Sequence, residues 1–115
     1  VVSVLGQPLR VTVVSARGLR DADSMPGAGH SDPYVVAEVL GKPMTRFTTE
    51  TMQSTADPVW NHEHLMAGSS TSDVLTFKVY DGDPTKGDDQ LGQARLLPGD
   101  YLPGGFDSEV ALEDA

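Results

Sequence analysis

Apolar and polar residues alternate with a period of two along three segments of the chain, which is the pattern of half-buried β-strands. Successive side chains of a strand point to opposite faces, so the apolar residues of each segment share one face. The pattern therefore predicts three strands with an inward apolar face. They are Leu9–Arg17 with Leu9, Val11 and Val13 inward, Pro33–Leu40 with Val35, Ala37 and Val39 inward, and Val74–Tyr80 with Leu75, Phe77 and Val79 inward and Thr76 and Lys78 outward.

Four further segments have a weaker strand pattern, and no segment keeps a period of 3.6 residues. The intervening stretches are rich in Gly, Pro, Asp and Ser, which favour turns. Seven or eight short strands at this spacing predict an all-β fold, an antiparallel sandwich in one domain covering residues 1–115. The weaker segments are Met44–Glu50, Val59–Met66, Leu91–Leu97 and Ser108–Leu112.

Composition narrows the function classes. The 115 residues carry a formal net charge of −9, which argues against nucleic acid as a partner because phosphate binding needs clustered Lys and Arg. The chain has no cysteine, so disulfides, thiolate metal sites and a cysteine nucleophile are excluded. No apolar run has the length of a membrane span, and no signal peptide is recognisable. We therefore expect a cytoplasmic protein.

Two loops beside the predicted strands hold the candidate chemistry. Asp23 and Asp32 lie in the first loop, and Asp81, Asp83 and Asp89 lie in the second. If folding brings the two loops to one end of a sandwich, these carboxylates repel one another unless a cation lies among them. Calcium accepts about six to eight oxygen ligands in flexible geometry, so it is the natural candidate. An EF-hand is excluded, because a twelve-residue loop starting at Asp81 places glycine where the bidentate glutamate belongs.

Four motifs in order along the chain resemble the C2 domain, the calcium-dependent lipid-binding module of the protein kinase C and synaptotagmin type. They cover roughly residues 9 to 112, and together they are far more specific than any one alone. The motifs are Gly18-Leu19-Arg-Asp-Ala-Asp23, Ser31-Asp-Pro-Tyr-Val35, Asp57-Pro-Val-Trp-Asn61, and Val79-Tyr-Asp-Gly-Asp83 with Asp89-Gln-Leu-Gly92.

This resemblance implies an eight-stranded Greek-key β-sandwich whose loops at one end bind two or three calcium ions and dock onto anionic phospholipid such as phosphatidylserine. All five aspartate ligands of the family are present in this sequence. The ligands that the resemblance implies are the side chains of Asp23, Asp32, Asp81, Asp83 and Asp89 and the carbonyl groups of Ala22 and Gly82.

Three departures from the family pattern concern the loops and the strand count. The first loop is longer than the commonest spacing, which places Met25 at a tip where it can insert into lipid. Lys86 stands where a Ser or Thr often lies near the outermost ion. Its positive charge disfavours a third ion there and favours an anionic lipid. The eighth strand is either Val1–Leu5 or lies beyond Ala115, which leaves the two circularly permuted topologies of the family open.

Other candidate sites have simpler explanations. His62 and His64 can share a strand face, but the metalloprotease motif needs a second histidine at position 66, which is methionine, so a solvated pair is favoured over a zinc site. Trp60 is expected to pack at the sandwich edge. Lys42 and Arg46 are the only basic residues where relatives carry a phosphoinositide groove, and two charges are typical of a solvated face.

The sequence therefore predicts a non-enzymatic, calcium-regulated module that binds membranes peripherally and forms part of a larger protein. No serine has a recognisable base and oxyanion arrangement, and no glycine-rich phosphate loop opens a helix. The alternative is a calcium-stabilised protein–protein interaction domain that does not bind lipid.

Overall fold

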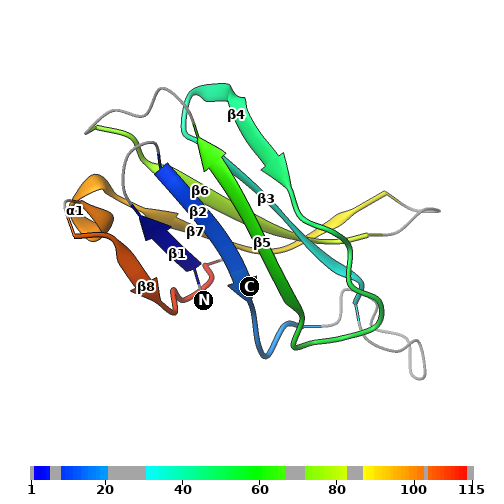
Figure 1. The fold of residues 1–115 in the computed structure, drawn as a ribbon. Coiled ribbons are helices and arrows are strands. Elements are labelled where there is room, and N and C mark those ends of the chain that lie inside the picture. The colour runs from blue at the N-terminus through cyan, green and yellow to red at the C-terminus, as the bar shows by residue number, and fades with distance from the viewer. Residues whose placement is uncertain are drawn as a thin grey trace.

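The computed structural model describes residues 2–5, 9–20, 31–66, 72–82, 87–102 and 104–113, which form eight strands and one short helix. The strands form two sheets that pack face to face (Figure 1). The elements are β1 (Val2–Leu5), β2 (Leu9–Ser15), β3 (Pro33–Val39), β4 (Lys42–Thr48), β5 (Val59–Met66), β6 (Leu75–Asp81), β7 (Asp89–Leu96), α1 (Pro98–Tyr101) and β8 (Phe106–Ser108).

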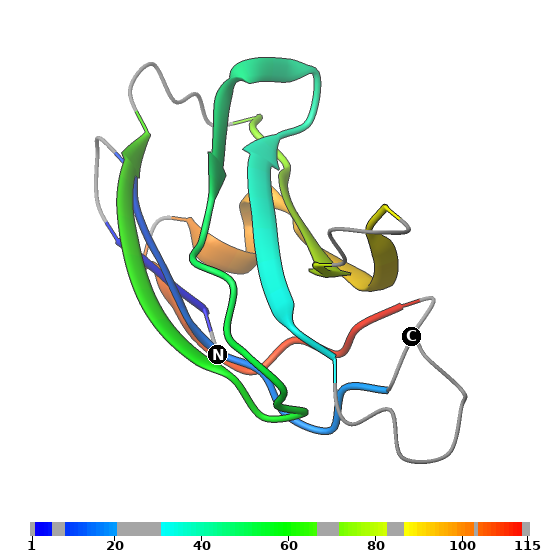
Figure 2. The same cartoon turned by 90° about the vertical axis from the view of Figure 1, so that its right-hand side faces the viewer.

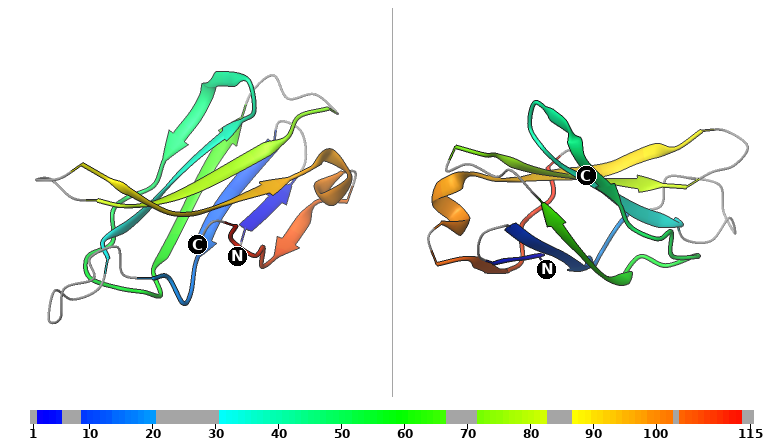
Figure 3. Two further views of the ribbon diagram at one scale, coloured as in Figure 1. Left: turned by 180° about the vertical axis from the view of Figure 1, so that it is seen from behind. Right: turned by 45° about the horizontal axis from the view of Figure 1, so that its top comes forward.

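The two sheets have four strands each, in the orders β5-β2-β1-β8 and β4-β3-β6-β7, and all paired strands are antiparallel. Both layers are visible in Figure 3. The predicted all-β antiparallel sandwich is confirmed. Strand β1 lies between β2 and β8, with Val2 opposite Val13 on one side and Ser108 on the other. The N-terminal segment therefore supplies the eighth strand, which is the first of the two alternatives that the sequence left open.

The core consists of the inward faces that the period-two pattern predicts. All nine predicted inward residues of β2, β3 and β6 are at most 4% exposed. Thr76 is the exception to the predicted outward faces, since only 8% of it is exposed. Its hydroxyl donates a hydrogen bond of 2.9 Å to the Glu38 carbonyl, so the polar group is satisfied against the neighbouring strand.

The C-terminal strand prediction, Ser108–Leu112, is wrong. Strand β8 ends at Ser108, and the following residues leave its sheet for the other one (Figure 2). There Glu113 exchanges two backbone hydrogen bonds with Gln93 of β7, of 2.7 and 2.9 Å. Val110 and Leu112 pack against the core on the way. Alternating apolar residues thus fill the gap between the sheets here rather than forming one face of a strand.

The helix α1 follows the turn signal at Pro98. Its first turn is stabilised by Asp100, whose Oδ2 accepts the backbone N–H of Leu97 at 2.8 Å. The helix places Tyr101 in the core, where its hydroxyl donates to the Asp73 carbonyl at 2.5 Å. With four residues, this one helix among the described parts of the chain is far too short to cross a bilayer.

Candidate metal centre

Three of the five predicted aspartate ligands lie where neighbouring strands begin or end. Asp32 directly precedes β3, Asp81 is the last residue of β6, and Asp89 is the first residue of β7. These strands are adjacent and antiparallel in the order β3-β6-β7, so the start of β3, the end of β6 and the start of β7 all lie at the same end of one sheet (Figure 1). In the register, Asp81 stands opposite Pro33 on one side and Asp89 on the other. The topology thus brings the described ends of the two aspartate loops together.

The two loops are joined through Asp32 and Asp81. The backbone N–H of Asp32 donates a hydrogen bond of 2.9 Å to Asp81 Oδ1, and the Asp32 carbonyl accepts the N–H of Gly82 at 2.9 Å. Two residues that are 49 positions apart in sequence are therefore held side by side. The prediction that these loops meet is confirmed for these residues.

A third loop, between β4 and β5, reaches the same place. The N–H of Ser54 donates to Asp32 Oδ1 at 2.6 Å, from a residue with a φ of 50°. Each of these contacts uses one oxygen, while a carboxylate has about four lone-pair sites. Asp32 and Asp81 can therefore accept both the backbone donor and a cation. Ser54 escaped the sequence reasoning because its left-handed backbone, not its side chain, makes the contact.

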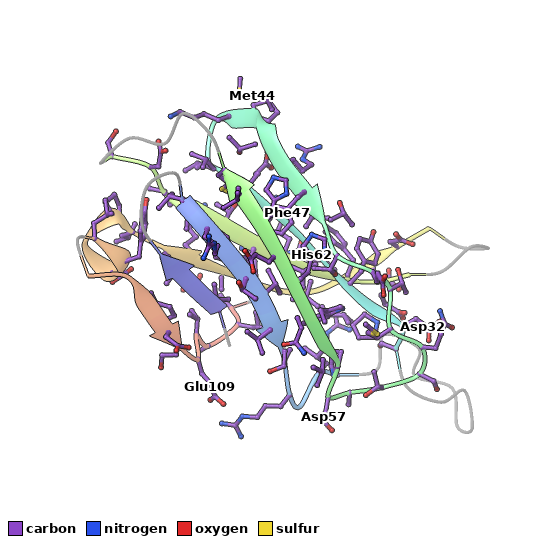
Figure 4. The ribbon with its side chains drawn as sticks, viewed as in Figure 1. Asp32, Met44, Phe47, Asp57, His62 and Glu109 are labelled. Carbon is purple, nitrogen blue, oxygen red and sulfur yellow. The ribbon has the colours of Figure 1, made fainter. Side chains whose placement is uncertain are left out.

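The first loop is fixed at its base by the segment around Asp57. Asp57 Oδ1 accepts the N–H of Gly18 at 2.9 Å, and the Ala56 carbonyl accepts the N–H of Leu19 at 3.0 Å. Gly18 has a φ of 65°, a conformation that glycine adopts without steric cost. Trp60 is buried as predicted, and its indole N–H donates to the Pro33 carbonyl at 3.2 Å. The Asp-Pro-Val-Trp motif thus anchors the base of the first loop and the start of β3. Asp57 is labelled in Figure 4.

The second aspartate loop is tied to β3 by Tyr34, whose hydroxyl donates a hydrogen bond to Asp88 Oδ2. Burial, and next the hydrogen bond to Asp88, raise the pKa of Tyr34 to about 12, because both favour the protonated hydroxyl that donates to Asp88. Asp88 immediately precedes the predicted ligand Asp89. The outward position of Tyr34 in its strand was the one available signal, and sequence reasoning did not use it.

Five predicted site residues lie outside the described residues, namely Ala22, Asp23, Met25, Asp83 and Lys86. Among the described residues, no group of three or more His, Asp or Glu side chains is arranged to hold a metal ion. The structure therefore brings together the described ends of the loops, and the complete ligand set remains a prediction.

The histidine pair has a packing role. His62 and His64 stand opposite Val13 and Val11 in the register, so both share the inner face of their sheet. Each is half-buried and stacks on Phe47, with ring centroids 5.3 and 4.4 Å apart (Figure 4). The solvated pair predicted from the sequence is therefore corrected to an aromatic stack that closes the edge between β4 and β5.

Comparison with known proteins places this fold in a family. The family model described as "C2 domain" matches residues 7–109. Human cytosolic phospholipase A2 delta is 35% identical over 97 residues, covering 84% of this chain and 12% of the relative. Synaptotagmin-3 of Arabidopsis thaliana is 31% identical over 106 residues, covering 91% of this chain and 19% of the relative.

Solved structures agree with these matches. A C2 domain of plant extended synaptotagmin 1 superimposes with a TM-score of 0.68 at 28% identity, over 78% of this chain and 67% of that one. A C2 domain of the RIM protein from Drosophila gives a TM-score of 0.77 at 22% identity, over 88% of this chain and 86% of that one, and so supports the fold alone.

The chain spans about an eighth of the phospholipase and about a fifth of the plant synaptotagmin. The similarity to the phospholipase covers the C2 region only, so it assigns this chain no catalytic function. The family model, the relatives and the sandwich with its joined loops agree, and they support a membrane-binding module. The chain belongs to the C2-domain family.

Proposed function

We propose that this domain is a calcium-dependent phospholipid-binding module. The observation that carries the proposal is the hydrogen bond between the Asp32 backbone and the Asp81 side chain, which joins the two aspartate loops at one end of the sandwich. Together with C2 membership, this contact supports a common location for Asp32 and Asp81, to which we assign the other predicted ligands as well. A calcium ion there supplies the positive charge that lets several carboxylates share one site.

The residues that would hold calcium form an all-oxygen donor set, which suits a hard cation. Asp32 and Asp81 fit this role because their described contacts leave carboxylate lone pairs for an ion. The proposed ligands are the side chains of Asp23, Asp32, Asp81, Asp83 and Asp89 and the carbonyls of Ala22 and Gly82, for two or three ions.

The proposed mechanism is an electrostatic switch. Without calcium, five carboxylates at the loop end repel an acidic membrane. Two or three ions change the charge of this cluster from −5 to between −1 and +1, while the whole domain goes from −9 to between −5 and −3. Attraction to phosphatidylserine is therefore local to the loop end, and screening over about 8 Å at physiological ionic strength confines it there. Met25 and Lys86 are the proposed lipid contacts.

The proposed setting is a larger cytoplasmic protein that this domain brings peripherally to a membrane. Two relatives, human cytosolic phospholipase A2 delta and Synaptotagmin-3 of Arabidopsis thaliana, are several times longer than the segment that matches. In such a parent protein, chemistry would belong to other domains, and this one would control where the protein acts.

A calcium-stabilised protein–protein interaction domain is the second candidate. Both basic residues of the stretch that carries a lipid groove in relatives are engaged in ion pairs, Lys42 with Asp73 at 2.8 Å and Arg46 with Glu38 at 3.3 Å. These pairs favour an acidic or neutral outer face over a second lipid site. They do not concern the loop end, where the first candidate places the membrane.

The test is a calorimetric titration with calcium, carried out on the domain alone and on the domain mixed with vesicles. If phospholipid completes the coordination of bound calcium, the two ligands bind cooperatively. Calcium then raises the affinity of the domain for vesicles by some factor, and vesicles raise its affinity for calcium by the same factor. We expect phosphatidylserine vesicles to raise the affinity and phosphatidylcholine vesicles to raise it much less. Calcium binding that no vesicle changes favours the protein-interaction domain, and no calcium binding at all contradicts both candidates.

A further inference from the structure

A pocket of about 1030 Å³ lies between the two sheets, on the side where the chain passes from β8 to β7. One of its walls is the segment 109–112, which we call the strap and which crosses from one sheet to the other (Figure 2). A pocket of this size with a mainly apolar wall is the usual form of a small-molecule site. The inner wall comes from both sheets and consists of Val13, Val35, Trp60, Phe77, Val79, Leu91 and Ala94.

The pocket is narrow and closed to water at its inner end. Val13, Val79 and Leu91 are at most 3% exposed. Packed sheets lie about 10 Å apart, and side chains of both inner faces fill part of that distance, so the pocket admits a flexible chain more readily than a fused ring system. Apolar cavities stay dry and bind apolar molecules. The shape and lining therefore favour an unbranched alkyl chain.

The mouth of the pocket is polar but carries no formal net charge. The described charged residues of the lining are the cations Arg17 and Arg20 and the carboxylates Asp57 and Glu109. Arg17 donates two hydrogen bonds to Glu109, from Nε at 3.0 Å and from Nη2 at 2.8 Å. Glu109 and Asp57 lie on the same side of the molecule in Figure 4.

This balance of charges decides which head group suits the mouth. A head group with hydroxyls can accept a hydrogen bond from a guanidinium and donate one to a carboxylate. An anionic head group would instead meet two carboxylates, in a domain whose net charge is −9. A neutral, hydroxyl-bearing head group therefore fits best.

We propose that this pocket binds a neutral single-chain lipid of the monoacylglycerol class, which enters beneath the strap. The acyl chain lies between the sheets, and the glycerol head group stays at Arg17 and Glu109. Of the described residues that line the pocket, none is a proposed calcium ligand. The site therefore does not depend on the proposed calcium function.

The strap can open because its described contacts are mostly exposed. Val110 and Leu112 are only half-buried against the core. The side chains of the Arg17–Glu109 pair are 78% and 56% exposed, and Glu113 adds two backbone hydrogen bonds to β7. Segments with few buried contacts open locally without global unfolding. A ligand can thus reach the inner wall while the two sheets stay packed.

The single tryptophan of the chain, Trp60, lines the pocket and reports its occupancy. The probe is a monoacylglycerol whose undecanoyl chain is brominated at its terminal carbon, because bromine quenches indole fluorescence on contact. It is added in excess chelator, below the concentration at which it aggregates. We expect saturable quenching that the unbrominated monoacylglycerol reverses by competition. The matching brominated fatty-acid anion should bind at least about tenfold more weakly.

Absence of saturable quenching overturns the proposal, and so does equal binding of the monoacylglycerol and the fatty-acid anion. Quenching only by aggregates or vesicles would show contact with a lipid surface, which contradicts occupancy of the pocket. A domain that sediments as a dimer and excludes the probe would place a second copy of the chain at the pocket, which contradicts the proposal as well.

Variants that narrow the pocket test the location of the ligand. Ala16 is half-buried in the pocket wall and Ala111 is exposed on the strap, so leucine at either position reduces the volume. We expect Ala16→Leu and Ala111→Leu each to weaken binding several-fold, and Thr12→Leu, on the outer face of β2, to leave it unchanged. Ala111→Leu decides the matter if Ala16→Leu does not fold, since an exposed position tolerates the larger side chain. Normal affinity in Ala111→Leu and in a folded Ala16→Leu contradicts the proposal.

The ion pair of the strap tests the route of entry. Glu109→Gln weakens the pair with Arg17, and Glu63→Gln weakens the pair between Glu63 of β5 and Arg10 of β2, whose glutamate is equally exposed at 56%. We expect Glu109→Gln to speed association of the brominated probe several-fold in stopped-flow quenching, and Glu63→Gln to leave the rate unchanged. Equal rates in the two variants would contradict entry beneath the strap.

Discussion

The backbone N–H of Asp32 lies 2.9 Å from Oδ1 of Asp81, so one predicted calcium ligand is hydrogen-bonded to the main chain of another. The Asp81 carboxylate is thereby oriented before any ion binds. Because the contact uses a backbone donor, it does not depend on the Asp32 side chain, and among substitutions at this position only proline removes the donor. Asp81 consequently has two separable roles, one in joining the loops and one in the proposed ion site.

Replacing Asp81 tests these two roles. Asp81→Asn keeps a side-chain oxygen that can accept the Asp32 N–H, whereas Asp81→Ala removes it and leaves a partly buried donor without its partner. In excess chelator we expect the alanine variant to lose about 1–2 kcal/mol of unfolding free energy and the asparagine variant to lose much less. Urea denaturation measures both. Both variants should lose calcium affinity, so an asparagine variant that binds calcium normally would remove Asp81 from the ligand set.

Neutralising the other predicted ligands of this loop should separate stability from function. Asp83→Asn with Asp89→Asn removes two mutually repelling charges, so we expect the double variant to melt at or above the wild-type temperature in chelator. In saturating calcium the order should invert, because wild type gains about 2.7 kcal/mol at a hundredfold excess of calcium over Kd for one site.

The control for these melts is Glu50→Gln with Asp107→Asn, two exposed carboxylates outside the proposed ion site. This variant removes the same charge and should keep the full calcium-dependent rise in melting temperature. A double variant Asp83→Asn, Asp89→Asn that is much less stable than wild type in chelator would identify these aspartates as structural turn residues.

Tyr34 should make the domain sensitive to alkali. Its pKa is raised from an ordinary value of 10 to about 12 in the folded protein, first by burial and then by the hydrogen bond to Asp88. Because the pKa is higher in the folded than in the unfolded protein, the protonated hydroxyl contributes stability at pH values below 10. This contribution is lost as the pH rises from 10 toward 12. We expect Tyr34→Phe to flatten this part of the stability profile. Tyrosinate absorbance gives a second readout, since the wild-type minus variant difference should titrate near 12.

Lys42 should contribute to stability through its ion pair with Asp73. Its Nζ is 2.8 Å from Oδ1 of Asp73, whose side chain is 3% exposed, so Lys42→Met leaves a buried carboxylate without this partner. We expect a loss of about 1–3 kcal/mol in unfolding free energy. Arg10→Met is the comparison, because both side chains of the Arg10–Glu63 pair are more than half exposed and such pairs contribute about 0–1 kcal/mol. Equal losses would show that the burial of Asp73 has no effect.

The inward faces of the sheets were predictable from the sequence because burial acts on alternate residues of a strand. Leu9, Val11 and Val13 illustrate this, since each is at most 3% exposed. The same reasoning failed at residues 108–112, where Val110 and Leu112 also alternate but pack between the sheets. Period two therefore indicates side-chain burial, and strand pairing depends in addition on a partner with free backbone groups.

The candidate site was predictable only in its charged residues. Aspartates in two loops suggested an ion site, and the structure joins the described ends of those loops. The contacts that make the junction come from the main chain of Asp32, Ser54 and Gly82, and no side-chain pattern encodes them. Tyr34 was missed for a related reason, because its partner Asp88 is 54 residues away and the contact depends on the fold.

Vesicle sedimentation with and without calcium tests the central claim, that calcium bound at the aspartate loops brings this domain to an anionic membrane. We predict that the domain pellets with phosphatidylserine vesicles in calcium, stays in the supernatant in chelator, and pellets much less with phosphatidylcholine vesicles. The variant Asp83→Asn with Asp89→Asn should remain in the supernatant in all conditions. Sedimentation that is the same in calcium and in chelator, or that the double variant retains, would contradict the claim.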